Sequence, residues 1–229
     1  YYHGGGFVVG SVEIFDPLAR SLAKISKAIV ISVDYRLAPA HPYPAAVNDC
    51  YSALLWAAEN AEVLGGDPNK LIVAGDSAGG NLAAVVALKA RDKGGPAIVA
   101  QLLYYPVTDL NKTNYPSFQN FIDGYGLSSN ASQGFHDAYL GRDTDTANPY
   151  VSPLYAKSLV GLPPALIVTG GFDPLTDGAK AYGKRLREAG VVVVDDYYPG
   201  MIHGFMSIGL FTQQRQALES TGRFLQEVL

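Results

Sequence analysis

The stretch Gly75-Asp76-Ser77-Ala78-Gly79-Gly80 decides the fold of this 229-residue chain. It follows an apolar run at 71–74 and precedes an alanine-rich run at 82–90, which predicts a strand, a tight turn and a helix. A Gly-x-Ser-x-Gly sequence in this setting is typical of a nucleophile elbow, a sharp turn that presents a serine at the carboxyl end of a strand. We expect Ser77 in a sparsely populated backbone conformation, and glycine at 75 and 79 because strand and helix pass too close there for a Cβ.

A glycine-rich turn before a helix can instead cradle a phosphate group. That alternative is weak here because no Gly-Lys-Ser/Thr follows the turn and the chain contains no Gly-x-Gly-x-x-Gly. The elbow interpretation therefore depends on whether the rest of the chain supplies its catalytic partners.

The composition is that of a globular chain whose ligand is a small molecule. Apolar residues make up 48% of the sequence, enough to bury a sizeable core. A formal net charge of -4 at pH 7 without a basic cluster argues against nucleic acid as a partner. The single cysteine, Cys50, excludes an internal disulfide and lies on an apolar helix stripe, where we expect a buried structural thiol. No apolar run approaches the roughly 20 residues of a membrane span, and we expect a cytoplasmic protein.

Apolar strands alternate with helices along most of the chain. We expect strands at 28–35, 71–74, 97–105, 165–170 and 191–198, and helices at 16–27, 45–64, 82–90, 175–189 and 212–228. Asp16 as N-cap and Pro17 as first helical residue mark the start of the first helix. Because the strands are apolar throughout, they indicate an α/β fold with a mostly parallel sheet covered by helices on both faces.

The segment from about 110 to 162 interrupts this alternation. It is rich in Asn, Ser, Gly, Tyr and Phe, contains one expected helix at 132–140, and is too long for a plain connection. We interpret it as a cap, or lid, inserted into a single catalytic domain that spans 1–229. The chain begins at Tyr1 without methionine and near the end of a strand, so we expect the N-terminal strands and cap helices of this domain to be absent from it.

A serine hydroxyl needs a base that takes its proton and an acid that orients the base. Four histidines are available. His203 follows the last strand at the end of the sheet where Ser77 is expected, and it is the best candidate. His3 lies in a glycine loop, His41 in a proline loop and His136 in the insertion.

Asp173 is the candidate acid because it ends the strand that begins at Ala165. Asp173-Pro174 is also an ordinary N-cap followed by proline, but one carboxylate can both cap a helix and orient an imidazole. Asp177, one turn into the helix, is the second choice. Asp195 and Asp196, in or near the last strand, are weaker candidates.

The resulting order Ser77, Asp173, His203 is the order of catalytic residues in α/β-hydrolases, which also carry a His-Gly-Gly-Gly-type oxyanion loop. The sequence His3-Gly4-Gly5-Gly6 fits that loop. Acyl transfer develops negative charge on the carbonyl oxygen, and we expect the backbone N–H groups of Gly4, Gly5 and Ala78 to stabilise it.

Together these segments resemble the hormone-sensitive-lipase family of α/β-hydrolase esterases, in its bacterial carboxylesterase branch. The matching pieces are His3-Gly4-Gly5-Gly6, Asp34-Tyr35-Arg36-Leu37-Ala38-Pro39, Gly75-Asp76-Ser77-Ala78-Gly79-Gly80, Asp173-Pro174-Leu175 and His203-Gly204-Phe205. The resemblance implies an α/β-hydrolase fold with a cap, no cofactor or metal, and hydrolysis of short-chain acyl esters through an acyl-enzyme. It also implies that Ser77 is the nucleophile, His203 the base and Asp173 the orienting acid.

The sequence departs from the family pattern at two positions. Ala40 and Gly178 stand where glutamate is common, and we expect looser support around the site without loss of a catalytic group. Two alternative functions remain open: a non-catalytic small-molecule receptor, as in the gibberellin receptors that share this scaffold, or a hydrolase of amides or lactones. The receptors lack the catalytic histidine, whereas His203 is present here. A homodimer through the strand at 191–198 is a further hypothesis, which a monomeric sedimentation profile would overturn.

Overall fold

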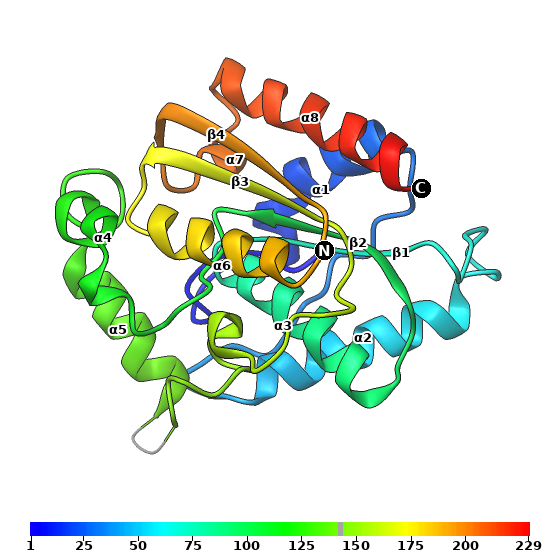
Figure 1. The fold of residues 1–229 in the computed structure, drawn as a ribbon, viewed down its shortest axis with the longest axis horizontal. Helices are drawn as coiled ribbons and strands as arrows, with labels where there is room; N and C mark the ends of the chain where they lie inside the picture. Colours follow the sequence, from blue (N-terminus) through cyan, green and yellow to red (C-terminus); the bar gives the residue numbers. More distant parts are fainter. Residues whose placement is uncertain (142–143) are drawn as a thin grey trace.

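Residues 1–141 and 144–229 are described by the computed structural model, in which a four-stranded sheet has the order β1-β2-β3-β4 (Figure 1). The strands are β1 (Leu71–Asp76), β2 (Ile98–Tyr104), β3 (Ala165–Phe172) and β4 (Val193–Ile202). All three pairings are parallel, so the carboxyl ends of the strands meet at one edge of the sheet. The predicted α/β fold with a parallel sheet is confirmed.

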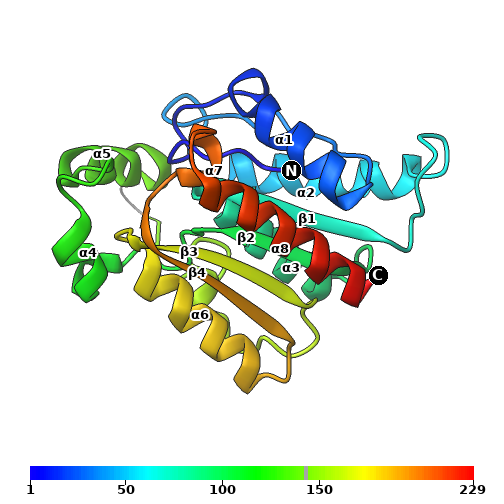
Figure 2. The ribbon, with the colours of Figure 1, turned by 90° about the horizontal axis from the view of Figure 1, so that it is seen from above.

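Helices cover both faces of this sheet (Figures 1 and 2). One face carries α1 (Val12–Ser26), α7 (Phe205–Ile208) and α8 (Thr212–Val228), and the other carries α2 (Ala45–Asn60), α3 (Ala78–Lys93) and α6 (Thr176–Glu188). Successive residues of a strand point to opposite faces. Leu102 and Tyr104 accordingly pack in the core beneath α8, whereas Leu103 packs in the core beneath α3.

Helix α3 is the most deeply buried helix among the described residues, since every residue from 78 to 90 is buried. Its small alanine side chains let it pack between the sheet and α2. The helix ends at Gly94, whose φ of 61° is the left-handed conformation that glycine adopts at helix ends. The alanine-rich run that follows the serine turn therefore fixes where the turn sits relative to the sheet.

Two boundaries at the start of the chain differ from the prediction. Helix α1 begins at Val12 because Ser11, not Asp16, is its N-cap and accepts a hydrogen bond from the N–H of Ile14. Asp16 lies inside the helix and pairs with Arg20 at 2.6 Å. The expected strand at 28–35 is reduced to an isolated bridge between Val33 and Tyr2.

The 110–162 segment forms short elements beside the carboxyl ends of the strands (Figure 1). These elements are the 3₁₀ turn η1 (Lys112–Asn114), α4 (Pro116–Phe121), α5 (Ser129–Leu140) and the 3₁₀ turn η2 (Pro153–Tyr155). Helix α5 begins three residues before the predicted start because Ser128 caps it and accepts from the N–H of Ala131. Within the described ranges, no helix combines the length and apolar character that crossing a membrane requires.

Candidate active site

The turn between β1 and α3 has the expected strained geometry. Ser77 has φ 55° and ψ -116°, a conformation that non-glycine residues rarely adopt. A Cβ on Gly79 would lie 1.9 Å from the carbonyl oxygen of Tyr2, and one on Gly75 would lie 2.2 Å from that of Gly79. Only glycine fits at both positions, so the predicted reason for the two glycines is confirmed.

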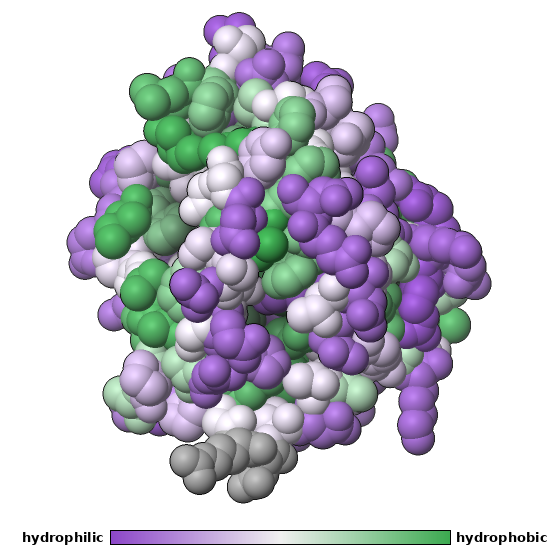
Figure 3. All heavy atoms as spheres, turned by 90° about the vertical axis from the view of Figure 1, so that its left-hand side faces the viewer, coloured by the Kyte–Doolittle hydropathy of each residue, from purple (hydrophilic) through white to green (hydrophobic). Residues whose placement is uncertain are grey.

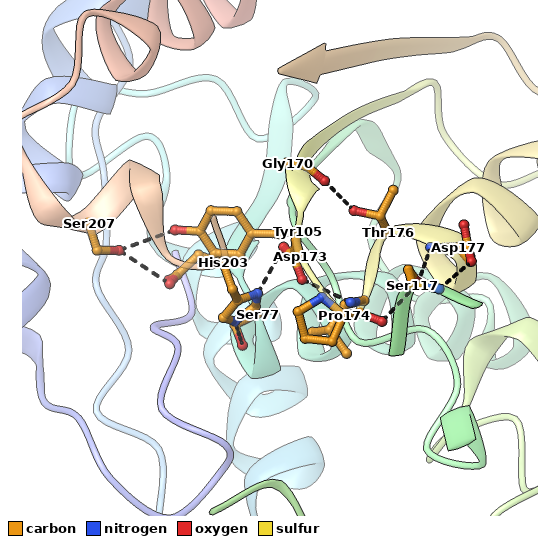
Figure 4. A network of polar contacts seen from close by, with 12 residues as sticks. Ser77, Tyr105, Ser117, Gly170, Asp173, Pro174, Thr176, Asp177, His203 and Ser207 are labelled. Atoms are coloured by element: carbon orange, nitrogen blue, oxygen red, sulfur yellow. Dashed lines mark hydrogen bonds and ion pairs between the residues drawn. The ribbon is translucent and has the colours of Figure 1, made fainter. Parts of the chain in front are cut away.

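Ser77, His203 and Asp173 form a continuous chain of hydrogen bonds (Figure 4). Nε2 of His203 lies 2.9 Å from Oγ of Ser77, and Nδ1 lies 2.9 Å from Oδ2 of Asp173. Because a carboxylate only accepts hydrogen bonds, Nδ1 carries the proton and Nε2 is left to accept from the serine hydroxyl. The structure thus brings together the three side chains that the sequence nominated, in the tautomer that nucleophilic catalysis requires.

Each partner is held by the end of a strand. Asp173 follows β3 and is fully buried, and its second oxygen, Oδ1, accepts the N–H of Leu175 at 2.8 Å. The carboxylate therefore fixes the turn that leads into α6 and orients the imidazole. The N-cap of α6 is Leu175 and not Asp173, so the N-cap interpretation of Asp173-Pro174 is wrong. His203 follows β4, and the ring of Tyr105 packs edge-on against it at 4.8 Å between centroids.

Opposing effects set the pKa of His203. Burial lowers the pKa of the imidazole, but the charge of Asp173 and its hydrogen bond raise it, and the net pKa lies above that of an ordinary histidine. This direction suits a group that accepts a proton from Ser77 and holds it as imidazolium during reaction.

Asp76 is a functional side chain that the sequence analysis missed. Its carboxylate is buried and accepts from the Tyr1 hydroxyl at 2.5 Å, the Gly4 N–H at 2.9 Å and, more weakly, the Ser207 hydroxyl at 3.4 Å. Burial raises the pKa of Asp76 to about 6, against the lowering effect of these donors. The sequence feature that could have indicated a role for Asp76 is its position inside the Gly-x-Ser-x-Gly sequence. The carboxylate joins the serine turn to the His-Gly-Gly-Gly loop.

This contact contradicts the role predicted for Gly4. Gly4 has a single N–H, and that group donates to Asp76 rather than lining the space above Ser77. Gly5 and Gly6, the next two residues, do line that space. Ala78 begins α3, so its N–H has no acceptor within the helix.

A cavity of about 210 Å³ lies over Ser77. Its walls come from the glycine loop, the strand ends and the 110–162 segment, and include Gly5, Gly6, Ser77, Lys112, Phe135 and His203. Figure 3 shows the face of the molecule at this end of the sheet, where hydrophilic and hydrophobic side chains are intermixed. The cavity is lined mainly by apolar side chains, with polar groups around the serine.

The other candidate acids have different partners. Asp177 accepts the N–H of Ser117, and its own N–H donates to the Ser117 hydroxyl (Figure 4). It therefore fastens α4 to α6 and is not the acid of the serine site. Asp195 pairs with Arg187, and Asp196 accepts from the Tyr198 hydroxyl.

The remaining histidines also lie outside the hydrogen-bond chain of Ser77. His3 is buried, its Nδ1 lies 2.7 Å from the Gly4 carbonyl oxygen, and its ring stacks on Tyr35 at 4.4 Å. His3 therefore supports the glycine loop. His136 lines the cavity and lies 3.3 Å from Asp137, and His41 is exposed in the proline loop. Cys50 is fully buried, as expected.

Fold and site together define a hydrolase with a serine, histidine and aspartate at the carboxyl edge of a parallel sheet. The sequence model of the α/β hydrolase fold matches residues 1–207, and the chain belongs to this family.

Relatives with similar sequences are esterases, which is a narrower class than hydrolases in general. The chain is 46% identical over 228 residues to the carboxylesterase NlhH of Mycobacterium tuberculosis, covering 98% of this chain and 70% of the relative. It is 38% identical over 229 residues to an arylesterase of Saccharolobus solfataricus, covering all of this chain and 74% of the relative.

The solved structures that are similar to this chain are also esterases. A hyperthermophilic esterase from the archaeon Pyrobaculum calidifontis superposes with a TM-score of 0.96 at 43% identity, covering all of this chain and 76% of that one. EstE1, a thermostable carboxylesterase from a metagenomic library, also gives 0.96, at 41% identity and 79% coverage of its chain. The predicted α/β-hydrolase fold, the resemblance to hormone-sensitive-lipase-type esterases and the predicted enzyme class, a carboxylic ester hydrolase, are confirmed.

Proposed function

We propose that the chain hydrolyses short-chain carboxylic esters through an acyl-enzyme on Ser77. The observation that supports this most directly is the hydrogen-bond chain from Ser77 through His203 to Asp173 beneath the cavity. It unites a nucleophile, a base and an orienting carboxylate in the arrangement that serine hydrolysis needs.

In the first half of the reaction, Oγ of Ser77 attacks the ester carbonyl carbon while its proton passes to Nε2 of His203. The resulting imidazolium is stabilised by the carboxylate of Asp173. When the tetrahedral intermediate collapses, the C–O bond to the alcohol breaks, and Nε2 returns the proton to the departing oxygen. The alcohol leaves, and the acyl group remains on Ser77.

The second half repeats these steps with water. Nε2 of His203 takes a proton from a water molecule, whose oxygen attacks the acyl-enzyme carbonyl. The second tetrahedral intermediate then expels Oγ of Ser77, which recovers its proton from Nε2. The carboxylic acid is released and the enzyme returns to its starting state.

The carbonyl oxygen is negatively charged in both intermediates and requires hydrogen-bond donors. We assign this role to the N–H groups of Gly5, Gly6 and Ala78, of which Gly6 replaces the Gly4 expected from the sequence. Each donor is worth on the order of 3 kcal/mol of transition-state stabilisation. The bond from Gly4 to Asp76 fixes the loop just before the two glycines that line the cavity.

The volume of the cavity supports small substrates. At about 210 Å³ it lies below the roughly 300–1,000 Å³ of pockets that enclose drug-sized ligands. Leu110, Leu127 and Phe135 of the 110–162 segment contribute apolar wall, so we assign this segment the role of a cap over the acyl site.

Hydrolysis of p-nitrophenyl acetate, butyrate, octanoate and laurate by the wild-type chain and by Ser77→Ala tests the proposal. Loss of the triad serine costs on the order of 10⁶ in turnover, so a contaminating esterase is easily recognised. We expect serine-dependent hydrolysis that declines beyond octanoate. Equal rates for the two proteins would contradict the esterase mechanism and favour a receptor on the same scaffold. Serine-dependent cleavage of anilides or lactones at higher kcat/KM than esters would favour the amide or lactone alternative.

A further inference from the structure

Lys112 places a cationic side chain in the wall of the cavity that contains Ser77 and His203. It lies in η1, the first element of the 110–162 segment, and is half-buried. Its Nζ lies 5.8 Å from the centre of the Phe118 ring, which borders it on one side. The catalytic steps proposed above do not use this lysine.

No carboxylate lies within ion-pair distance of the Lys112 ammonium in residues 1–141 and 144–229. The acid that most affects it, Asp109, already has other partners. Oδ2 of Asp109 accepts from the hydroxyls of Tyr115 and Tyr155 at 2.9 and 3.0 Å, and Oδ1 accepts the N–H of Asn111 at 2.7 Å. Among the described residues, the positive charge of Lys112 therefore has no carboxylate in direct contact with it.

The positive charge of Lys112 also affects the pKa of His203, the proposed catalytic base. Burial lowers the pKa of Lys112 to about 8, so the side chain remains mostly protonated at pH 7. Its proximity lowers the pKa of His203, in opposition to Asp173. Among the described residues, the other ionisable groups lining the cavity are Tyr105, whose pKa burial raises, and His136, His203 and Asp76, of which Asp76 already accepts from Tyr1 and Gly4. Partial burial of an unpaired ammonium is unfavourable, and an anionic ligand group would relieve that cost.

We propose that Lys112 binds an ionised carboxylate of the substrate, so that the preferred esters are short molecules with a second carboxylate, such as half-esters of dicarboxylic acids. This inference rests on the proposed esterase function. The lysine supplies a charge-assisted hydrogen bond to the anionic end while the ester carbonyl lies over Ser77. Lys112 acts in binding and takes no part in proton transfer.

A pair of substrates of matched shape tests this. Monoethyl glutarate carries the carboxylate, and ethyl 5-methylhexanoate carries an isopropyl group in its place; ethanol release is measured for both. A charged hydrogen bond contributes on the order of 1.5–3 kcal/mol, so the ratio of kcat/KM for the anionic over the neutral ester should fall about tenfold or more in Lys112→Met. We expect the loss mainly in KM, with Lys112→Arg restoring most of the ratio. A second pair, carboxymethyl butyrate and isobutyl butyrate, carries the carboxylate or the isopropyl group on the alcohol side of the ester. The same ratio of kcat/KM for this pair shows whether Lys112 binds an anion of the alcohol part or of the acyl part.

Lys157→Met is the matched control, because Lys157 lies in the same segment but is exposed and does not line the cavity. Its substrate ratio should equal that of the wild type. Equal losses on both esters in Lys112→Met, or no loss on either pair, would overturn the inference and leave the esterase function intact. If neither ester were cleaved in a Ser77-dependent manner, the proposed function would fail. Calorimetry would then measure the binding of monoethyl glutarate to Ser77→Ala and to the double variant Ser77→Ala/Lys112→Met. Binding that is lost in the double variant would support the role of Lys112, and equal binding would contradict it.

Discussion

Replacing Asp173 by asparagine tests the orientation of His203 while leaving the volume of the site almost unchanged. In the wild type, Oδ1 of Asp173 accepts the N–H of Leu175 and Oδ2 accepts from Nδ1 of His203. An asparagine has one oxygen and one NH₂ group for these two donors. If its oxygen faces His203, its NH₂ group opposes the N–H of Leu175, and two donors are left buried without an acceptor.

The mismatch determines which way the asparagine side chain turns. An unsatisfied buried polar group costs about 1–3 kcal/mol, so the oxygen should face Leu175 and the NH₂ group should donate to Nδ1 of His203. Nε2 then carries the proton and can no longer accept the proton of Ser77. A wrong tautomer of this kind lowers kcat by about 10⁴, equivalent to roughly 5 kcal/mol of barrier.

The assay is kcat/KM for p-nitrophenyl butyrate between pH 5 and 9. In the wild type we expect activity to rise with pH as the imidazolium loses its proton, with a midpoint above the ordinary histidine pKa of about 6.5. In Asp173→Asn the residual activity should have its midpoint at lower pH, because the negative charge that raised the pKa of His203 is gone. A loss below tenfold with an unchanged midpoint would refute this account of Asp173.

Three other substitutions, the first paired with a control substitution, test the supporting structure. Gly79→Ala should prevent stable folding or lower the melting temperature sharply, because its Cβ would overlap the Tyr2 carbonyl oxygen. The control is Gly134→Ala in α5, where a Cβ meets open space. It should be neutral or stabilising by up to about 1 kcal/mol in thermal melts. Ser117→Ala removes both hydrogen bonds that its hydroxyl makes to α6 and its flank, and should lower the free energy of urea unfolding by about 1–3 kcal/mol; a change below 0.5 kcal/mol would contradict that role. Burial raises the pKa of Asp76 to about 6 in the folded chain, so its ionisation destabilises the fold as pH rises from about 4 through 6. The free energy of unfolding of Asp76→Asn should therefore gain roughly 1 kcal/mol relative to wild type between pH 5 and 7.5. A stability difference between the two proteins that is independent of pH would contradict the burial argument.

Strong local patterns account for the parts of the fold that the sequence predicts well. Helix α8 was predicted at 212–228 and occupies those residues, because its apolar positions recur with helical spacing. The serine turn was predicted from glycines whose replacement would cause backbone overlap. The order of Ser77, Asp173 and His203 is recognisable because each lies at or after the end of a run that the sequence predicts as a strand.

Features that depend on pairing between distant segments were harder to predict. The run at 28–35 has the composition of a strand but forms only one bridge, since ladder length depends on the partner and not on propensity. Gly4 and Gly5 are indistinguishable in the sequence, and only the position of the Asp76 carboxylate shows which N–H is occupied. Lys112 lies in a polar, irregular segment, where no periodicity indicates which side chains face the cavity.

Covalent labelling of Ser77 tests the central claim most directly. Diethyl p-nitrophenyl phosphate should release one equivalent of p-nitrophenol per chain and leave a diethylphosphoryl group on the peptide that contains Ser77, located by mass spectrometry. Ser77→Ala should remain unlabelled, and His203→Ala should react far more slowly because no base removes the serine proton. Labelling at another residue, or equal labelling rates in wild type and His203→Ala, would contradict the proposal that this hydrogen-bond chain activates Ser77.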